Sequence, residues 1–309
     1  FNLGVVVHPE FEYVKCKVGD EYWIVAKELA DYVIKEKAGK EYEIVDTFPG
    51  TALEGKRYTP AFDKVFPELE EEKKRTKAIH TIILDREFVH LEEGSGLVHF
   101  APGCGDTSYD IAMKTHIKPF STLGDKGEYP QDHPVFGGLV SKKDDAKFTE
   151  LIDERGGLIT QFKFAHSYPH CWRCKNPVIF RITTQWFFKI EDLKDKMREL
   201  NKGIKWIPES AGSKNFDNWL SNLRDNGITR QRYWGTPLPI WKCSQCKKYV
   251  VIGSIDELKK LAGRLPEDLH KPWIDEVKIK CECGGTKERI PDILDVWIDA
   301  GSSSWNCLD

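Results

Sequence analysis

Two pairs of cysteines in the last third of the chain limit most strongly how this sequence can fold. Cys243 and Cys246 are spaced as C-x2-C, and Cys281 and Cys283 are spaced as C-x-C within CECGG. Two such turns can bring four thiolates to one tetrahedral zinc ion at a low entropic cost. Four protein ligands leave no open position on the ion, so we predict a structural zinc site. The alternative is a set of four free surface thiols.

A third pair, Cys171 and Cys174 in HCWRC, offers half of a metal site. The remaining cysteines are single: Cys16, Cys104 and Cys307. His166 or His170 could join the half site, but we expect the partner pair to lie outside this stretch of sequence. A thioredoxin-like dithiol is the alternative, although no βαβ pattern surrounds it. Close pairing without a secretory signal favours reduced, metal-binding cysteines over disulfides.

Length, charge and hydropathy set broader limits. A chain of 309 residues suggests two domains, or one large domain with insertions. The net charge of −3, with both signs mixed, argues against a histone-like basic binder but leaves room for a local tRNA-binding patch. The sequence has no apolar run long enough to span a membrane and no signal peptide. It starts without Met in a strand-like run, as expected for an excised fragment.

Local patterns predict a β-rich half followed by a mixed half. Runs such as LGVVVHP and EYVKCKV predict strands, and the segment after residue 21 starts as a strand and becomes a helix closed by Gly39. We expect EEEKKRTK to be a solvated surface segment, and a further helix to end at Gly156. In the second half, IEDLKDKMRELNKG and NFDNWLSNLRDNG predict helices, and SIDELKKLAG predicts a helix that opens on Ser254.

The stretch EGSGLVHFAPGCGDTSYD is a candidate ligand pocket. Gly94 and Gly96 let the backbone approach a ligand closely. His99 can present a ring edge, and residues 105 to 109 can open a helix whose amides face an anion. The alternative is a strand running into a turn, with a satisfied structural histidine.

Three longer motifs carry a family resemblance. GITRQRYWGTPLPIW (227–241) and PDILDVWIDAGSSSW (291–305) resemble the catalytic domain of class I aminoacyl-tRNA synthetases for branched aliphatic amino acids. SYPHCWRCKNPVIFRITTQWFF (167–188) resembles isoleucyl-tRNA synthetase more than the valyl or leucyl enzymes. LDVWIDAGSSSW and the C-x-C half of the zinc site look archaeal. The resemblance covers essentially the whole chain.

The resemblance implies a mixed α/β fold made of four parts. These are a β-barrel-like editing domain with flanking helices (1–165), a connection that returns into a Rossmann-type catalytic core (166–242), a zinc-binding insertion (243–290) and a catalytic-core segment (291–309). The His-x-Gly-His and Lys-Met-Ser-Lys-Ser signatures that grip ATP are absent from this sequence. ATP and Mg²⁺ are therefore expected to serve only the full-length enzyme, a cytoplasmic monomer that binds tRNA(Ile).

The implied reaction of the fragment is hydrolysis of the ester in Val-tRNA(Ile). One methylene is worth only about 1–3 kcal/mol in a hydrophobic pocket, and isoleucyl-tRNA synthetase is the usual example of this limit. In the family, the wall containing His99 belongs to the pocket that removes valine, and an Asp nine residues later holds the substrate ammonium. That position is Ser108 here, so we hypothesise that Asp106 replaces it. The alternative is a tRNA-docking, zinc-stabilised module whose pocket has lost editing.

Four further residues are candidates for substrate binding. Asp125 in LGDKGEY resembles a residue of the pocket rim, although a turn Asp explains it equally. Trp297 and Asp299 match the synthetic site of the family, where the Trp lines the amino-acid pocket; the alternatives are a core Trp and an N-cap Asp. Trp234, with the neighbouring arginines, suits stacking on a nucleotide or on tRNA, or packing between a strand and a helix.

Overall fold

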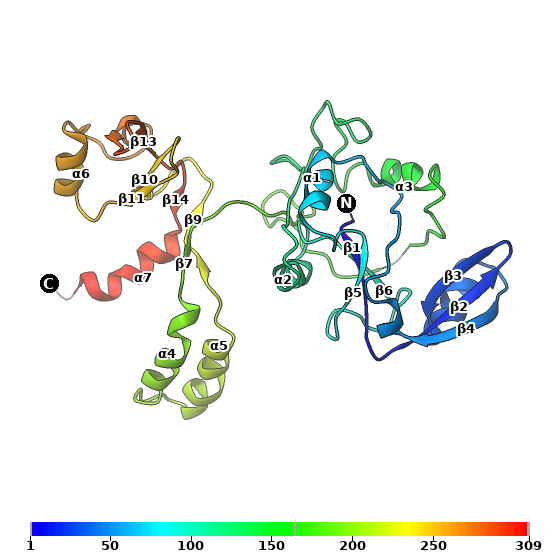
Figure 1. Ribbon diagram of the computed structural model, residues 1–309. Coiled ribbons are helices and arrows are strands. Elements are labelled where there is room, and N and C mark those ends of the chain that lie inside the picture. The colour runs from blue at the N-terminus through cyan, green and yellow to red at the C-terminus, as the bar shows by residue number, and fades with distance from the viewer. Residues whose placement is uncertain (1, 164, 308–309) are drawn as a thin grey trace. The chain divides into compact units, whose positions relative to one another are not determined.

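The computed structural model describes residues 2–163 and 165–307 and divides the chain into two compact units (Figure 1). The first unit is Phe1–Ile182 and the second is Thr183–Asp309. The division lies inside the stretch 166–242 that the sequence analysis assigns to a connection.

A small three-stranded sheet forms the centre of the first unit. Its middle strand, β1 (Gly4–Val7), pairs in parallel with β5 (Thr81–Leu84) and antiparallel with β6 (Leu97–Phe100). Apolar residues from this sheet and from helices α1 (Pro67–Arg75) and α2 (Asp106–Lys114) form the main core. Its buried members are Leu3, Val6, Phe66, Leu69, Ile79, Val89, Phe100, Ile111, Ala112, Ile117 and Phe136. Helix α3 (Asp145–Asp153) adds partly buried side chains to this core.

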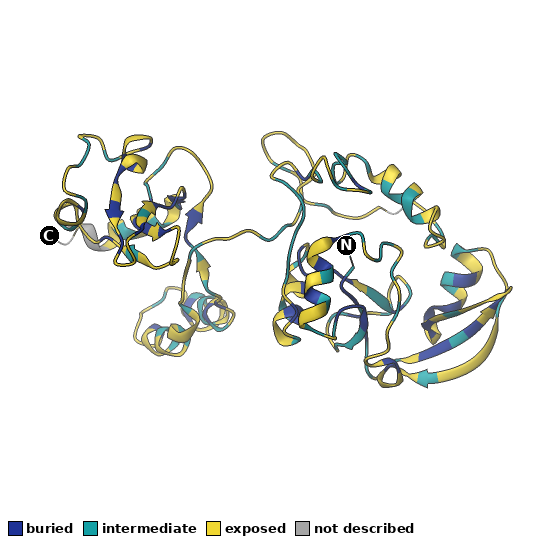
Figure 2. Ribbon diagram, turned by 45° about the horizontal axis from the view of Figure 1, so that its top comes forward, coloured by how far each residue is buried: buried dark blue, intermediate teal, exposed yellow. Residues whose placement is uncertain are grey.

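A second sheet in this unit is the antiparallel meander β3–β2–β4, made of β2 (Glu12–Val18), β3 (Glu21–Ala26) and β4 (Glu43–Pro49). Alternate residues of β2 pack against the helical turns η1 (Lys27–Leu29) and η2 (Asp31–Lys37), with Cys16 and Ile34 fully buried between them. Figure 2 shows that β4 is exposed along almost its whole length, as expected of an edge strand.

The barrel-like editing domain expected over residues 1–165 is not what the structure has. The described residues form two open three-stranded sheets, not a closed barrel. Pro9 and Glu10 turn the chain between β1 and β2, so the two strands join different sheets. The sheets share a buried cluster around Tyr13, Ala26 and Leu53, next to the short turn η3 (Gly50–Leu53). Side-chain packing, without strand pairing, therefore connects the two sheets.

The segment EEEKKRTK (70–77) was expected to be a solvated surface segment, and this prediction is confirmed for all of its residues except Glu72, because the others are exposed or partly exposed. Residues 70–75 of this segment belong to helix α1, which starts with Pro67 at its first position and carries acidic residues in the first turn and basic residues in the last. This charge order suits the helix macrodipole. Leu69 and Glu72 are buried, and the Glu72 carboxylate pairs with Arg75 and accepts the amide of Lys118 at 2.8 Å.

The second unit contains a four-stranded antiparallel sheet in the order β11–β10–β13–β12. Its strands are β10 (Ile240–Cys243), β11 (Tyr249–Val251), β12 (Lys278–Lys280) and β13 (Thr286–Arg289). Trp241 is almost fully buried between this sheet, helix α6 (Ile255–Ala262) and the turn η6 (Trp273–Glu276). Helix α6 opens on Ser254 as predicted, because the Ser254 hydroxyl accepts the amide of Glu257.

The rest of the second unit is built from short elements. The pair β7 (Phe187–Phe188) and β8 (Asn226–Gly227) leads into a helical hairpin of η4 (Glu191–Leu193), α4 (Lys194–Asn201), η5 (Ala211–Phe216) and α5 (Asp217–Ser221). The pair β9 (Thr229–Arg230) and β14 (Ile293–Leu294) precedes α7 (Val296–Asn306). Every strand pair described in this unit is antiparallel, so the expected Rossmann-type sheet does not appear there. No described helix is both long and apolar enough to cross a membrane.

Candidate metal centre and pockets

The four cysteines of the predicted zinc site come together in the second unit. Cys243 ends β10 and Cys246 lies in the following turn, whereas Cys281 and Cys283 lie in the turn between β12 and β13. Their sulfur atoms all lie within 4.8 Å of one another, and the Cys243–Cys283 and Cys246–Cys281 pairs are 3.6 Å apart. Sulfurs about 2.3 Å from a tetrahedral zinc ion are about 3.8 Å apart. The arrangement therefore fits a four-coordinate metal.

Hydrogen bonds distribute the protons of this cluster unevenly. The amide of Cys246, and after it that of Gln245, lowers the pKa of the Cys243 thiol to about 6. The amide of Gly285 lowers the pKa of Cys283, but bonds to the neighbouring cysteine sulfurs outweigh it and raise that pKa to about 11. Four adjacent thiolates repel one another, so full deprotonation requires a bound cation.

Segments 171–176 and 243–248 form the same turn in the two units. In each segment the amide of the first cysteine donates to the carbonyl of the sixth residue, at 2.8 and 2.9 Å. The amide of the fifth residue donates back to the first cysteine, at 2.8 and 3.2 Å, and both Lys175 and Lys247 have a φ of 63°. Cys171 and Cys174 thus lie in the same kind of turn as the first pair of the four-cysteine cluster, but within the described residues no third ligand, His166 and His170 included, completes a cluster around them.

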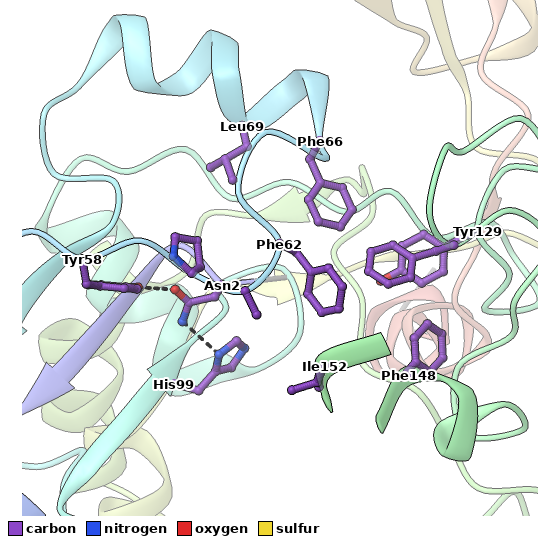
Figure 3. A pocket seen from close by; sticks show the side chains of 12 residues that line it. Asn2, Tyr58, Phe62, Phe66, Leu69, His99, Tyr129, Phe148 and Ile152 are labelled. Atoms are coloured by element: carbon purple, nitrogen blue, oxygen red, sulfur yellow. Dashed lines mark hydrogen bonds between the residues drawn. The ribbon is translucent and has the colours of Figure 1, made fainter. Parts of the chain in front are cut away.

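A cavity of about 400 Å³ lies in the first unit beside His99. Its walls are mostly aromatic or aliphatic, and Figure 3 shows rings from several segments facing one space. The lining residues are Asn2, Tyr58, Pro60, Ala61, Phe62, Phe66, Leu69, His99, Tyr129, Phe136, Phe148 and Ile152. No carboxylate is present among these described residues. Such an apolar space with a few polar groups at one end is typical of a small-molecule site.

The polar end of the cavity is a chain of hydrogen bonds through Asn2 (Figure 3). The Asn2 Nδ2 atom donates to the carbonyl of Gly4 at 2.7 Å and lies 3.0 Å from Nδ1 of His99. The Tyr58 hydroxyl donates to Asn2 Oδ1. The His99 side chain lines the cavity and is also exposed to solvent. Desolvation by the atoms packed around the ring lowers the pKa of His99 to about 4, so the ring is neutral at pH 7.

The lowered pKa of His99 makes stability depend on pH. The folded chain keeps this ring neutral down to pH about 4, whereas the unfolded chain protonates it near 6.5. The stabilising effect of the neutral ring is therefore complete above pH 6.5 and is lost as the pH falls towards 4. We expect the free energy of unfolding to fall more steeply across this range in the wild type than in His99→Gln. Equal slopes in urea titrations at pH 7, 6, 5 and 4 would contradict this.

Gly94 and Gly96, expected to approach a substrate, do not line the cavity. Both adopt a positive φ, of 79° and 76°. A Cβ on Gly96 would lie 2.3 Å from the Cβ of Ala26, whereas one on Gly94 would meet open space. The Gly96 carbonyl also accepts the buried Tyr13 hydroxyl at 2.8 Å. The close approach at Gly96 is therefore between two parts of the chain itself.

These two glycines form a matched pair for mutation. Gly94→Ala adds a Cβ to a left-handed residue and is expected to cost about 1–2 kcal/mol. Gly96→Ala carries the same strain and adds the clash with Ala26, so we expect it to cost about 1–3 kcal/mol more. Chemical denaturation of both variants measures the difference, and equal destabilisation would show that the contact relaxes freely.

The other residues predicted for the first pocket lie elsewhere. Asp106 is exposed at the first position of α2, whereas Ser108 on the same helix is buried. Neither lines the cavity. Asp125 lies in a turn, with 90% of its side chain exposed, and pairs with Arg181. The cavity therefore contains His99 but none of the three residues predicted to act with it, Asp106, Ser108 and Asp125.

A second cavity of about 400 Å³ lies in the second unit and brings together Trp234, Trp297 and Asp299. Asp299 accepts a hydrogen bond from the Thr236 hydroxyl at 2.9 Å, and Trp297 is 77% exposed. The helix N-cap is Asp295, which accepts the amide of Trp297 at 2.9 Å. The interpretations of Trp297 as a core residue and Asp299 as an N-cap are therefore wrong. The ring of Trp234 stacks on that of His270, with centroids 5.4 Å apart.

Comparison with known proteins identifies the family. Residues 19–309 match the family model described as tRNA synthetases class I (I, L, M and V). The chain belongs to this family. This synthetase chain is similar to the isoleucine–tRNA ligases of Methanopyrus kandleri (43% identical over 99% of the chain) and Thermococcus kodakarensis (40% identical over all of it). It spans about three tenths of the length of these curated relatives, 29% and 31%.

One solved structure also resembles the synthetase chain, the ternary complex of Agrobacterium radiobacter K84 LeuRS with tRNA and LeuAMS. The two are 30% identical, and the match covers 36% of this chain and 16% of that one, with a TM-score of 0.19. This structural overlap is too low to support an argument about the fold.

Sequence patterns did not reveal most of the residues around the first cavity of this synthetase. Tyr58 lies in a turn-rich segment, and Asn2 precedes the first strand. The aromatic walls come from four separate segments, at residues 62–66, 129, 136 and 148. Only tertiary contacts bring these residues together, so no local spacing could have identified them.

Proposed function

We propose that this chain is the editing part of an isoleucine–tRNA ligase and that it hydrolyses the ester of Val-tRNA(Ile). The observation that carries this proposal is the apolar cavity with neutral His99 at its polar end. The aromatic walls suit an aliphatic side chain, and the volume of the cavity limits the size of the side chain that can enter. The names of the relatives support isoleucine as the amino acid of the full enzyme and tRNA as the partner.

We assign His99 the role of a hydrogen-bond group at the reacting ester. A pKa of about 4 makes its ring a poor base at pH 7, so His99 is expected to orient or stabilise and not to remove a proton. No serine or cysteine is present among the described lining residues, so the attacking group is a water molecule. Donors fixed beside a developing oxyanion commonly accelerate ester hydrolysis.

The position of the carboxylates favours a second candidate function. The substrate ammonium needs an anionic partner, yet Asp106 is exposed and Ser108 is buried away from the cavity. A chain without that partner would bind tRNA without editing. Our hypothesis that Asp106 supplies the charge predicts slower deacylation by Asp106→Ala. An unchanged rate in this variant, together with weak wild-type activity, would favour the tRNA-docking module.

We propose zinc as the metal of the four-cysteine cluster, in a structural role. Four thiolates at tetrahedral spacing are the usual ligands of structural zinc. Cys171 and Cys174 are proposed to hold a second zinc ion together with a pair outside this sequence. Ligation of isoleucine with ATP and Mg²⁺ is proposed for the longer enzyme, with Trp297 and Asp299 in its amino-acid site and Trp234 beside it.

Comparison of two substrates tests the proposal. The folded, zinc-loaded chain is incubated with Val-tRNA(Ile) and with Ile-tRNA(Ile), and loss of the esterified amino acid is followed. We expect valine to be released at least about tenfold faster. The extra methylene of isoleucine changes the free energy of binding in a hydrophobic pocket by about 1–3 kcal/mol. Equal release of both amino acids, or release of neither, would reject an editing function for this chain.

A further inference from the structure

The Asn2 amide has a single orientation that satisfies its neighbours. A backbone carbonyl can only accept a hydrogen bond, so the atom 2.7 Å from the Gly4 carbonyl must be the NH₂ group. The Asn2 oxygen then faces Tyr58, whose hydroxyl donates to it. The Gly4 carbonyl fixes which end of the amide is which, and the Tyr58 hydroxyl, which can donate or accept, is compatible with that orientation.

This orientation decides where His99 carries its proton. The second hydrogen of the Asn2 NH₂ group points towards His99 Nδ1, 3.0 Å away. Nδ1 must therefore accept, and a neutral imidazole that accepts at Nδ1 carries its hydrogen on Nε2. The described residues supply no hydrogen-bond partner for Nε2 of His99, which lines the cavity.

We propose that Tyr58, acting through Asn2, is a positioning residue that fixes His99 in its Nε2–H tautomer and so makes the ring a hydrogen-bond donor to a ligand in the cavity. The ligand is the carbonyl of an ester, which rests on the editing function proposed above. Without the Tyr58 hydroxyl, only the bond to the Gly4 carbonyl holds the Asn2 amide, so we expect the contact between Nδ2 and Nδ1 to be held less firmly. His99 then populates both tautomers, and its donor is lost for part of the time.

Histidine NMR reads the tautomer without any catalysis. The ¹⁵N shifts of the two ring nitrogens are recorded in the histidine-labelled chain at pH 7.5, and the His99 signals are assigned by their loss in His99→Gln. We expect a protonated Nε2 and an unprotonated Nδ1 in the wild type. Asn2→Asp replaces the donor by an acceptor, so it is expected to place a proton on Nδ1. A wild-type ring protonated at Nδ1 would overturn the proposal, even if no variant folded.

Tyr58→Phe tests the positioning role, with Tyr22→Phe as a control because Tyr22 is exposed on β3. We expect Tyr58→Phe to shift the His99 nitrogens towards averaged values and to lower kcat for Val-tRNA(Ile) about tenfold with little change in KM. Wild-type nitrogen shifts in Tyr58→Phe would reject the inference. If the wild type shows the Nε2–H tautomer but hydrolyses no ester, the editing function fails and the positioning of His99 stands.

Discussion

Cys243→Ser is expected to release the metal and unfold the four-stranded sheet of the second unit. Cys243 is fully buried at the end of β10, and its sulfur lies 3.6 Å from that of Cys283. None of the turn residues between the paired cysteines belongs to a hydrophobic cluster, so the proposed ion would hold these turns together. Binding of structural zinc contributes about 10–16 kcal/mol of apparent free energy in small domains, and a missing thiolate removes much of it.

Metal analysis and hydrogen exchange measure this effect. Cys307→Ser is the matched control, because Cys307 is exposed and lies outside the cluster. We expect about one zinc ion per wild-type or Cys307→Ser chain and none per Cys243→Ser chain, with fast amide exchange over residues 240–251 and 278–289 in the latter. Full metal content in Cys243→Ser would show that this thiolate is not needed to bind the ion. Slow amide exchange in a metal-free Cys243→Ser chain would show that the sheet folds without the ion.

Phe100→Ala is expected to destabilise the first unit by about 3–5 kcal/mol, as is usual for a buried aromatic ring. Phe100 is fully buried in the main core, and its ring packs over Gly4, where an added Cβ would lie 3.2 Å from Cδ1. Removal of the ring leaves a cavity against β1, which the short strands on either side cannot close.

Phe162→Ala is the control for this change, because Phe162 is half exposed in the same unit. Its ring contacts the Lys37 ammonium, 4.7 Å from the ring centroid, so we expect a loss of at most about 1 kcal/mol. Hydrogen exchange of β1, β5 and β6 in urea reports the stability of this unit alone. A similar loss of unfolding free energy in the two variants would mean that the buried Phe100 ring stabilises the core no more than the half-exposed Phe162 ring does.

The features that could be predicted from sequence are those set by a few neighbouring residues. The spacing of Cys243, Cys246, Cys281 and Cys283 predicts their convergence, because each pair needs only one turn. The cap at Ser254 is equally local. The longer motifs indicated the synthetase family, which the family model confirms over residues 19–309. They also predicted that Trp297 and Asp299 belong to one site, and both residues line the second cavity.

The features that sequence patterns missed depend on contacts between distant segments. Helix α1 has a strongly charged sequence, and the burial of Glu72 depends on Arg75 and on the amide of Lys118, which no local pattern reveals. The barrel was expected from the family resemblance, but strand pairing depends on turns such as Pro9–Glu10. Asn2 connects Tyr58 to His99 by hydrogen bonds, although Asn2 and His99 are 97 positions apart in the sequence. Only the three-dimensional structure could reveal this contact.

We propose that the ester is hydrolysed in the cavity beside His99. The most direct test measures deacylation of Val-tRNA(Ile) by the wild type, His99→Ala and His90→Ala, each folded and zinc-loaded. His90 is an exposed histidine of the same unit that does not line the cavity. We expect His99→Ala to be slower by about 10²-fold, as for loss of one oxyanion donor, and His90→Ala to equal the wild type. Wild-type activity in His99→Ala would contradict the claim.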